Sequence, residues 1–219
     1  MKTSFPITVL SRIWLNEEAF ELTCSRPAGF SFHAGQYVAL EFQGEVREYT
    51  LLSPPDAQEL RFLIKQVVGG KLSAVLGKID LGSVLLMGKA RGYLTYHPTA
   101  RSIYFVATGV GIAPFVAMAA GGLQGFTLIH GARTESGLFY QREMAALSLQ
   151  YISCISGTNI FGAGSPTPYH GYVTEYIRTY LQPGQYDFYL CGSRAMIRDM
   201  THLLDQHHPR TRIFSEAYS

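Results

Sequence analysis

The chain has 219 residues and a net charge of +2, so it is long enough to bury a sizeable core and has no strongly basic surface for nucleic acid. Its three cysteines, Cys24, Cys154 and Cys191, are odd in number and scattered, which excludes a disulfide framework and a clustered zinc or iron–sulfur site. No apolar segment has the length of a signal peptide or of a membrane-spanning helix, so we expect a cytoplasmic protein with no metal site and no membrane span.

Residues 1–98 are predicted to form an all-β domain. Six short runs of alternating or apolar residues are separated by glycine, proline, aspartate or asparagine, a spacing typical of a closed or nearly closed antiparallel barrel. One helix is predicted over residues 71–76, directly after Gly69 and Gly70. The six predicted strands are residues 7–14, 19–25, 36–42, 47–53, 60–68 and 83–88.

Residues 99–219 have a different pattern, in which apolar strands alternate with helices. This alternation indicates a parallel α/β sheet, and the change of pattern places the domain boundary near residues 98–101. Residues 157–171 are rich in glycine, serine, threonine and proline, which predicts a long loop. The predicted strands are residues 103–107, 126–130, 151–155 and 187–191, and the predicted helices are residues 113–120, 143–147, 172–181 and 194–204.

The predicted β domain contains two motifs that can carry chemistry. Strand alternation puts Arg47 and Tyr49 on one face and Thr50 on the other, although an ordinary edge strand can have the same pattern. The run Gly-Gly-Lys-Leu-Ser at residues 69–73 places Ser73 near a helix start, where unpaired N–H groups and the helix dipole attract phosphate. Plain capping of the helix by a small residue is the alternative explanation.

Taken together, these motifs resemble the ferredoxin–NADP reductase superfamily, which includes cytochrome b5 reductase and flavin reductase. The family pattern of Arg-x-Tyr-Ser/Thr, Ile-Lys-x-Val and Gly-Gly-x-x-Ser is present in order at residues 47–50, 64–67 and 69–73. Residues 32–37 are similar to the family's Pro-Gly-Gln segment, with Ala34 where proline is usual. The resemblance runs from Val9 to Tyr218 and implies an antiparallel Greek-key β-barrel that binds FAD, followed by a Rossmann-like α/β domain with a parallel sheet that binds NAD(P).

The resemblance implies an FAD site in the β domain. Arg47 and the predicted helix start would hold the pyrophosphate, Arg47 through bidentate charge-assisted hydrogen bonds. Tyr49 would lie against the flavin ring or its ribityl chain, and Thr50 would offer a hydrogen bond near flavin N5, the hydride-accepting atom. The implied FAD-binding residues are Arg47, Tyr49, Thr50, Ile64, Lys65, Val67, Gly70, Lys71, Leu72, Ser73 and Tyr218.

A glycine-containing turn opens the first predicted helix of the α/β domain. It reads Thr-Gly-Val-Gly-Ile-Ala-Pro at residues 108–114 and follows an apolar strand, although two glycines alone would suit any tight strand–helix turn. In this context it resembles the family's Thr-Gly-x-Gly-x-x-Pro loop, in which glycines let the backbone approach the pyrophosphate of a nicotinamide dinucleotide. The implied residues are Thr108, Gly109, Gly111 and Pro114.

Two later segments complete the implied nicotinamide site. The resemblance places Cys191 and Gly192 against the nicotinamide ring, whereas a lone cysteine that ends an apolar strand is otherwise an inert core residue. Glu216 and Tyr218 match the family's Glu-x-Tyr ending, in which the tyrosine stacks on the flavin and yields to nicotinamide, and the glutamate steers protons or balances charge. A chain end is otherwise a frayed surface segment. The resemblance thus implies Thr50, Cys191, Glu216 and Tyr218 as catalytic residues.

The sequence favours NADH over NADPH as the electron donor. Family members that use NADPH place arginines around the 2′-phosphate after the third strand of this domain. Residues 154–159 contain no basic side chain here, and the next arginine or lysine is Arg178. Arg133 is the candidate partner for the nucleotide, although similar arginines occur in proteins that use NADH.

Basic residues are concentrated around the end of the predicted β domain. Seven lie between Arg61 and Arg101 against one acid, Asp80. This imbalance predicts a docking patch for a small acidic electron carrier such as ferredoxin or flavodoxin, with a solvated face plus FAD phosphate contacts as the alternative. The histidines have no metal-ligand spacing, and His130 is among those expected at turns or strand ends without clustered partners.

The predicted reaction is hydride transfer from C4 of NAD(P)H to N5 of FAD, followed by delivery of electrons to an external acceptor. Displacement of Tyr218 would gate the entry of nicotinamide. Two alternatives stay open. One is a flavin reductase that uses free flavin as a substrate, and the other is a redox-inactive, nucleotide-binding subunit of a larger electron-transfer complex.

Overall fold

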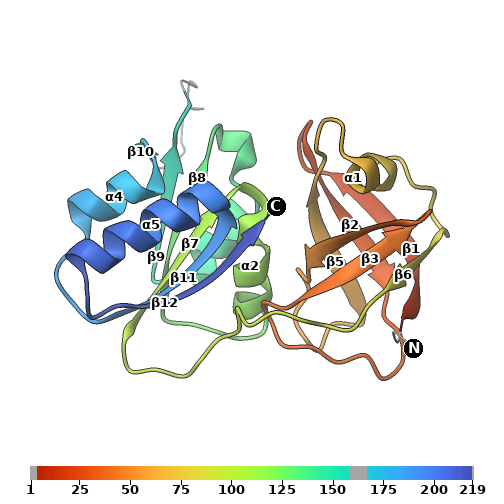
Figure 1. Ribbon diagram of the computed structural model, residues 1–219, viewed down its shortest axis with the longest axis horizontal. Coiled ribbons are helices and arrows are strands. Elements are labelled where there is room, and N and C mark those ends of the chain that lie inside the picture. Colours follow the sequence, from red (N-terminus) through yellow and green to blue (C-terminus); the bar gives the residue numbers. More distant parts are fainter. Residues whose placement is uncertain (1–3, 158–166, 219) are drawn as a thin grey trace. The chain divides into compact units, whose positions relative to one another are not determined.

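A computed structural model describes residues 4–157 and 167–218 of the chain (Figure 1). The chain divides into two compact units, the first comprising residues 1–96 with 113–122 and the second comprising residues 97–112 with 123–219. The return of residues 113–122 to the first unit is a feature that the sequence did not indicate. A domain boundary at residue 98 stays a prediction.

The first unit is a nearly closed antiparallel barrel, as predicted. Its strands are ordered β4-β3-β6-β1-β2-β5, and Leu51, directly after β4, forms a bridge with Phe62 of β5, which brings the two edge strands together. The strands are β1 (Phe5–Trp14), β2 (Ala19–Ser25), β3 (Tyr37–Phe42), β4 (Glu45–Thr50), β5 (Glu59–Lys65) and β6 (Val84–Met87).

Local turn chemistry fixes the register of two hairpins in this barrel. Phe42 pairs with Glu45, so only Gln43 and Gly44 connect β3 to β4, and both have positive φ angles, 52° and 80°. Two such residues in succession are the signature of a hairpin turn whose twist matches that of the strands. Between β1 and β2, the side-chain oxygen of Asn16 accepts hydrogen bonds from the backbone N–H groups of Glu18 and Ala19.

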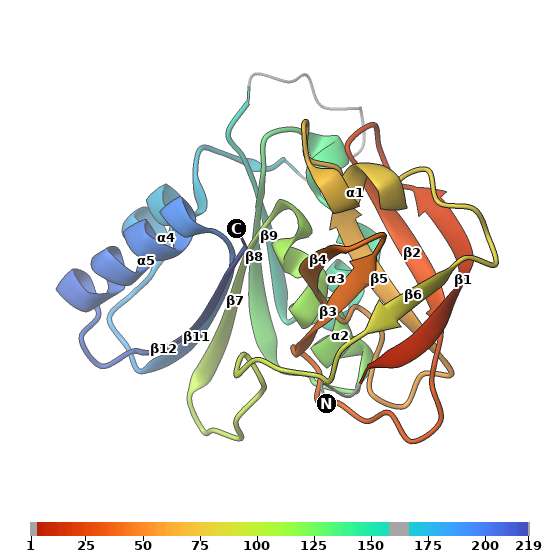
Figure 2. The same cartoon turned by 45° about the vertical axis from the view of Figure 1, so that its right-hand side comes forward.

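A short helix closes one end of the barrel. Helix α1 (Lys71–Leu76) lies there in both views (Figures 1 and 2), and its Leu72 and Leu76 are buried in the barrel core. Six residues are too few to form a stable helix alone, so packing must hold it. Burial of each leucine contributes about 1.5–3 kcal/mol.

The second unit contains a six-stranded sheet in which all strand pairs are parallel. Its order is β10-β9-β8-β7-β11-β12. Successive strands are therefore added on one side of β7 up to β10 and then on its other side from β11, so the strand order reverses between β7 and β11. Ligands of open α/β sheets bind at such a reversal, outside the carboxyl ends of the strands. The strands are β7 (Ser102–Thr108), β8 (Phe126–Ala132), β9 (Gln150–Ile155), β10 (Tyr169–His170), β11 (Tyr186–Ser193) and β12 (Arg212–Tyr218).

The helical elements are η1 (Gly109–Ile112), α2 (Ala113–Ala120), which belongs to the first unit, η2 (Glu135–Gly137), α3 (Gln141–Leu147), α4 (Val173–Tyr180) and α5 (Arg194–His207). Helices α4 and α5 cover one face of the parallel sheet (Figure 2). Val106, Ile129 and Leu190 point to that face and form a buried cluster with residues of both helices. Because side chains alternate along a strand, Ala107, His130 and Cys191 lie on the opposite face.

Two elements of this sheet differ from the expectation. The carboxyl-terminal segment, which we expected only as a functional motif, forms strand β12 and pairs in parallel with β11 from Asp187↔Arg212 to Ser193↔Tyr218. Within the predicted loop 157–171, Tyr169 and His170 form the short strand β10, while residues 158–166 lie outside the described residues. Both strands are set by pairing with distant segments, which local composition does not encode.

Candidate functional site

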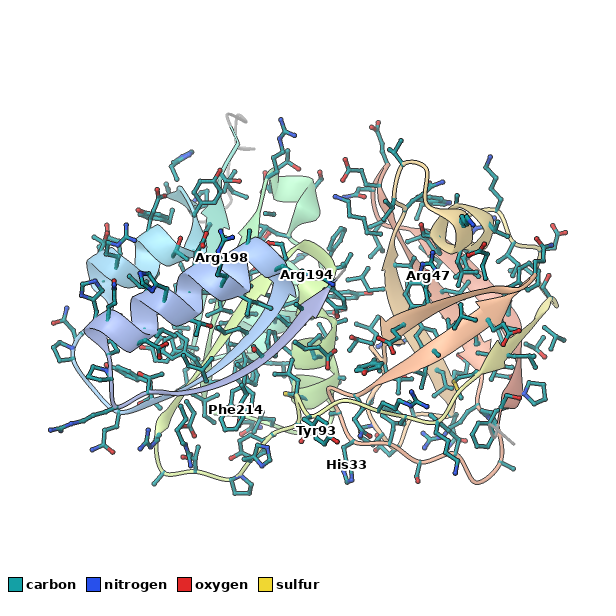
Figure 3. The ribbon with its side chains drawn as sticks, in the orientation of Figure 1. His33, Arg47, Tyr93, Arg194, Arg198 and Phe214 are labelled. Carbon is teal, nitrogen blue, oxygen red and sulfur yellow. The ribbon has the colours of Figure 1, made fainter. Side chains whose placement is uncertain are left out.

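Arg47 and Lys71, both predicted site residues, contact the same carboxylate. In the first unit, Glu45 Oε2 lies 3.7 Å from Arg47 Nη1, and Glu45 Oε1 lies 3.0 Å from Lys71 Nζ. Both basic side chains are more than half exposed, at 53% and 70%. Exposed ion pairs add little stability, so the main consequence of this arrangement is the position that it gives the two basic side chains. Two cations, one from β4 (Figure 3) and one from the start of α1, lie within reach of one anionic group.

Tyr49 provides an aromatic surface two residues after Arg47. It pairs with Val38 of β3, and its ring is partly buried against the barrel core. Burial raises the pKa of Tyr49 to about 12, although the charge of Arg47 opposes this rise. The phenol therefore keeps its proton at neutral pH. Thr50, the next residue, is buried and pairs with Tyr37.

The Gly-Gly-Lys-Leu-Ser run forms a tight turn into α1. The Gly70 N–H donates to the Val67 carbonyl over 2.8 Å, and the Val67 N–H donates to Ser73 Oγ over 3.2 Å. A Cβ atom on Gly70 would lie 2.9 Å from the Val67 carbonyl oxygen, so a side chain does not fit there. The buried Ser73 thus organises the turn that places Lys71 beside Glu45.

The other predicted residues of the first unit are placed differently. Ile64 and Leu72 are buried in the barrel core, so only their backbone groups could reach a ligand. Lys65 forms an ion pair with Glu18 over 2.8 Å, and the side chain of Val67 is exposed.

In the second unit, the glycine loop packs tightly against the end of β11. A Cβ on Gly111 would lie 2.3 Å from the carbonyl oxygen of Cys191, and a Cβ on Gly192 would lie 2.1 Å from Thr108 Oγ1. The Ser193 N–H donates to this same threonine oxygen over 3.3 Å. The two segments that the sequence singled out therefore meet at the reversal point of the sheet, and glycine is required at both contacts.

The backbone conformation and the free space at Gly109 show whether a dinucleotide could approach this loop. Its φ angle is +54°, and a Cβ placed on it would meet nothing within 4 Å. The space next to the Gly109 Cα is therefore open where η1 begins. Backbone N–H groups at a helix start can bind phosphate, so a loop with this open space is compatible with the pyrophosphate of a dinucleotide. Pro114 is the second residue of α2, where its missing N–H has little cost.

Cys191, Glu216 and Tyr218 come together at the same edge of the sheet. Cys191 pairs with Glu216 across β11 and β12, and the side chain of Tyr218 forms a hydrogen bond with the thiol. Burial raises the pKa of Cys191 far above its usual range; the hydrogen bond from Tyr218 opposes the rise, and the charge of Glu216 adds to it. Cys191 is therefore a neutral thiol at physiological pH and unsuited to act as a nucleophile.

Arg133 lies one residue beyond the carboxyl end of β8, at the same edge of the sheet. Its side chain is exposed, and its carbonyl accepts a hydrogen bond from the Gly157 N–H over 3.0 Å. Of the segment expected to contact a 2′-phosphate, residues 154–157 are described, whereas Thr158 and Asn159 lie outside the described residues.

The sequence did not reveal three other side chains near this edge. His130, which we expected to have no clustered partner, is fully buried, and its Nδ1 lies 2.9 Å from the hydroxyl oxygen of Tyr151. Arg194 and Arg198 lie one turn apart at the start of α5 (Figure 3), directly after Ser193, and both are exposed. Their i, i+4 spacing in the predicted helix was the available signal.

Two further expectations concern absent features. Among the described residues, no group of three or more histidine, cysteine, aspartate or glutamate side chains is arranged to hold a metal ion. Within residues 4–157 and 167–218, no helix has the length and apolar character needed to span a membrane.

Comparison with known families identifies two domains in the chain. The oxidoreductase FAD-binding domain matches residues 4–96, and the oxidoreductase NAD-binding domain matches residues 105–202. The two matches together take in most of the chain, and each falls on one of the motif groups described above.

Three known proteins illustrate the similarity. The toluate 1,2-dioxygenase electron transfer component of Pseudomonas putida is 30% identical in an alignment of 181 residues that covers 76% of this chain and 52% of that protein. The propane 2-monooxygenase reductase component of Mycolicibacterium goodii is 28% identical in an alignment of 211 residues that covers 88% of this chain and 61% of that protein. This chain therefore spans only about half to three fifths of these relatives. A ferredoxin NADP+ reductase from Neisseria gonorrhoeae, solved with bound FAD and NADP, has the same fold, with a TM-score of 0.87, 22% identity and 99% coverage of both chains.

Proposed function

Because the chain belongs to the ferredoxin–NADP reductase superfamily, we propose that it is an FAD-dependent oxidoreductase that takes electrons from NAD(P)H and passes them to an external acceptor. The observation that carries this proposal is the meeting of the Thr108–Gly111 loop with Cys191 and Gly192 at the reversal point of the parallel sheet. FAD, when bound, accepts a hydride from NAD(P)H and releases electrons to the acceptor.

The first unit supplies the groups that would hold FAD. Arg47 and Lys71 already share one carboxylate, so the pyrophosphate would take the place of Glu45 between them. The neutral ring of Tyr49 would give the flavin an aromatic wall next to these cations. Thr50 would contribute near flavin N5, and the turn at residues 67–73 would fix the position of Lys71.

The second unit supplies the groups that would hold the nicotinamide dinucleotide. The open backbone at Gly109 would bind the pyrophosphate, and the neutral thiol of Cys191 would offer the nicotinamide ring a polarisable contact without reacting. Tyr218, whose side chain is hydrogen-bonded to this thiol, would move aside when nicotinamide enters. Glu216 would balance charge or steer a proton.

Anaerobic reduction of the purified protein by NADH and by NADPH, followed by absorbance, tests the whole proposal. A yellow protein whose flavin bleaches on addition of either coenzyme is expected. Colourless protein that reduces added flavin would instead identify a free-flavin reductase, and absence of any reduction would identify a redox-inactive subunit. We infer that NADH is the better donor, since residues 154–159, where the family places arginines around a 2′-phosphate, contain no arginine or lysine.

The acceptor in this proposal is a small acidic carrier such as ferredoxin or flavodoxin. Four of the seven basic residues in the predicted docking patch are engaged in ion pairs, Arg61 with Glu21, Lys65 with Glu18, Lys71 with Glu45 and Arg101 with Asp187. The patch therefore narrows to Lys78, Lys89 and Arg91, which are exposed and form no ion pair with any described residue.

Salt dependence separates protein docking from the redox reaction itself. Reduction of an acidic carrier should slow steeply with ionic strength, whereas reduction of ferricyanide should change little. The double variant Lys89→Gln/Arg91→Gln should slow carrier reduction and flatten its salt dependence, and it should leave ferricyanide reduction unchanged. Equal salt responses for the two acceptors would refute a docking role for this patch.

A further inference from the structure

His130 has a fully buried imidazole and lies in the sheet next to the strand that leads into the glycine loop at Gly109. It lies on β8 next to Ala107 of β7, and the following pair, Thr108 and Gly131, is the last before η1 begins at Gly109. The pairing therefore places the ring one residue from the point where the backbone leaves the sheet to form the loop. On the other side, His130 pairs with Ser153 of β9.

The first nitrogen of this ring is bonded to Tyr151. Nδ1 lies 2.9 Å from the tyrosine hydroxyl oxygen, and burial raises the pKa of Tyr151 well above its usual range. The phenol therefore keeps its proton and can donate it to Nδ1. Burial also lowers the pKa of His130 to about 4, so the imidazole is neutral and carries a single N–H group. We assign the tautomer in which Nδ1 accepts from the Tyr151 hydroxyl, which puts that N–H group on Nε2.

The second nitrogen has no fixed partner. Nε2 is buried and makes no hydrogen bond within the described part of the chain. The backbone of Gly109 nevertheless opposes the fall in the pKa of His130. A backbone group that raises the pKa of an imidazole through a hydrogen bond is a carbonyl that accepts from it, so the Gly109 carbonyl is the group that acts on the ring. The ring thus combines a buried nitrogen that has no hydrogen-bond partner among the described residues with the influence of a loop carbonyl.

We propose that His130 is a positioning residue for the dinucleotide, whose Nε2–H donates to the Gly109 carbonyl when NAD(P)H binds. Formation of this bond would fix the Gly109 peptide and hold the following N–H groups towards the pyrophosphate. Hydrogen bonds of this kind are often long in an unliganded protein and shorten in the complex. Tyr151 acts indirectly, because its hydrogen bond to Nδ1 fixes the tautomer of the His130 imidazole. This inference rests on the proposed function, since it assumes that the loop binds NAD(P)H.

Two amide substitutions test which nitrogen matters. The amide nitrogen of glutamine can replace Nε2, whereas that of asparagine can replace only Nδ1. We expect His130→Asn and His130→Leu to raise the KM for NADH about tenfold, which corresponds to 1.4 kcal/mol, with kcat changed less than about twofold. His130→Gln should keep the KM within about threefold of the wild-type value. Tyr151→Phe leaves the imidazole in place but frees its tautomer, so an intermediate KM is expected.

Two controls separate the possible outcomes. Thermal unfolding of each variant reports structural damage, and reduction by dithionite reports the flavin site without any dinucleotide. Glutamine, asparagine and leucine variants that lose stability alike and keep the wild-type KM would show that His130 only fills the core, which overturns the inference. If the leucine variant does not fold, the comparison of glutamine with asparagine and the Tyr151→Phe variant still decide. A wild-type protein that binds neither NADH nor NADPH would instead overturn the proposed function.

Discussion

The side chain of Tyr218 forms a hydrogen bond with the buried thiol of Cys191 across the parallel strands β12 and β11. In our proposal the nicotinamide ring lies at this end of β11. A ligand that bound there would then have to displace Tyr218, and its apparent affinity would be lowered by the free energy of that displacement.

Removal of the Tyr218 ring should therefore tighten binding of the oxidised coenzyme. We expect Tyr218→Ala to lower the Kd for NAD+ about tenfold, equivalent to 1.4 kcal/mol, as measured by titration of the flavin absorbance. Tyr218→Phe, the matched control, retains the ring and loses only the hydroxyl, so its Kd should change much less. An unchanged or higher Kd in the alanine variant would show that Tyr218 does not compete with nicotinamide.

The pair of cations around Glu45 leads to a prediction on FAD binding. Arg47→Ala removes a charge-assisted contact with the pyrophosphate, which should weaken FAD binding by about 1.5–3 kcal/mol and yield largely colourless protein. Glu45→Gln, the matched control, removes the carboxylate that competes for both cations, so FAD should bind as tightly as in the wild type or more tightly. Fluorescence titration of the deflavinated protein measures both. Full flavin content in Arg47→Ala would contradict its assigned role.

Gly109 and Gly125 form a second matched pair, because both have positive φ angles and open space around a Cβ. Alanine at either position should cost about 1–2 kcal/mol of stability through backbone strain alone. Gly125 lies at the amino end of β8, away from the loop edge, so only Gly109→Ala should raise the KM for NADH. Equal KM values for the two variants would remove Gly109 from the dinucleotide site. Thermal unfolding should detect the similar strain in both.

Local patterns in the sequence predicted most of this fold. Helix α1 and the strands of the barrel follow from alternation and from turn residues such as Gly44, because these signals act over a few neighbouring positions. The meeting of Thr108 with Gly192 was accessible only through a family resemblance that links two distant motifs. Both motifs end adjacent parallel strands, which is why they share one edge of the sheet.

Contacts that depend on register between distant strands could not be predicted. The bond between His130 and Tyr151 exists because β8 and β9 pair in parallel with His130 beside Ser153, a register that neither segment specifies alone. The link from Arg47 through Glu45 to Lys71 likewise depends on how α1 meets β4. Strand β12 was missed because its pairing partner, β11, supplies the constraint that its own composition lacks.

The last prediction concerns Asp187, a carboxylate near the amino end of β11, and the dependence of the free energy of unfolding on pH. Asp187 is buried and accepts hydrogen bonds from the Arg212 guanidinium. Burial alone would raise the pKa of Asp187, but the hydrogen bonds from Arg212 and Thr99 and the charges of Arg212 and Arg101 outweigh it and lower the pKa. A lowered pKa means that folding favours the ionised form, so this stabilisation is complete above the ordinary carboxyl pKa of about 4 and is lost as pH falls below it.

Asp187→Asn should therefore lower the free energy of unfolding at neutral pH, and its deficit relative to wild type should shrink in acid. Asp199→Asn, which removes the carboxylate of an exposed ion pair on α5, is the matched control, and urea unfolding at several pH values measures both variants. A deficit of Asp187→Asn that stayed constant down to pH 3 would show that Asp187 is not held ionised by these partners.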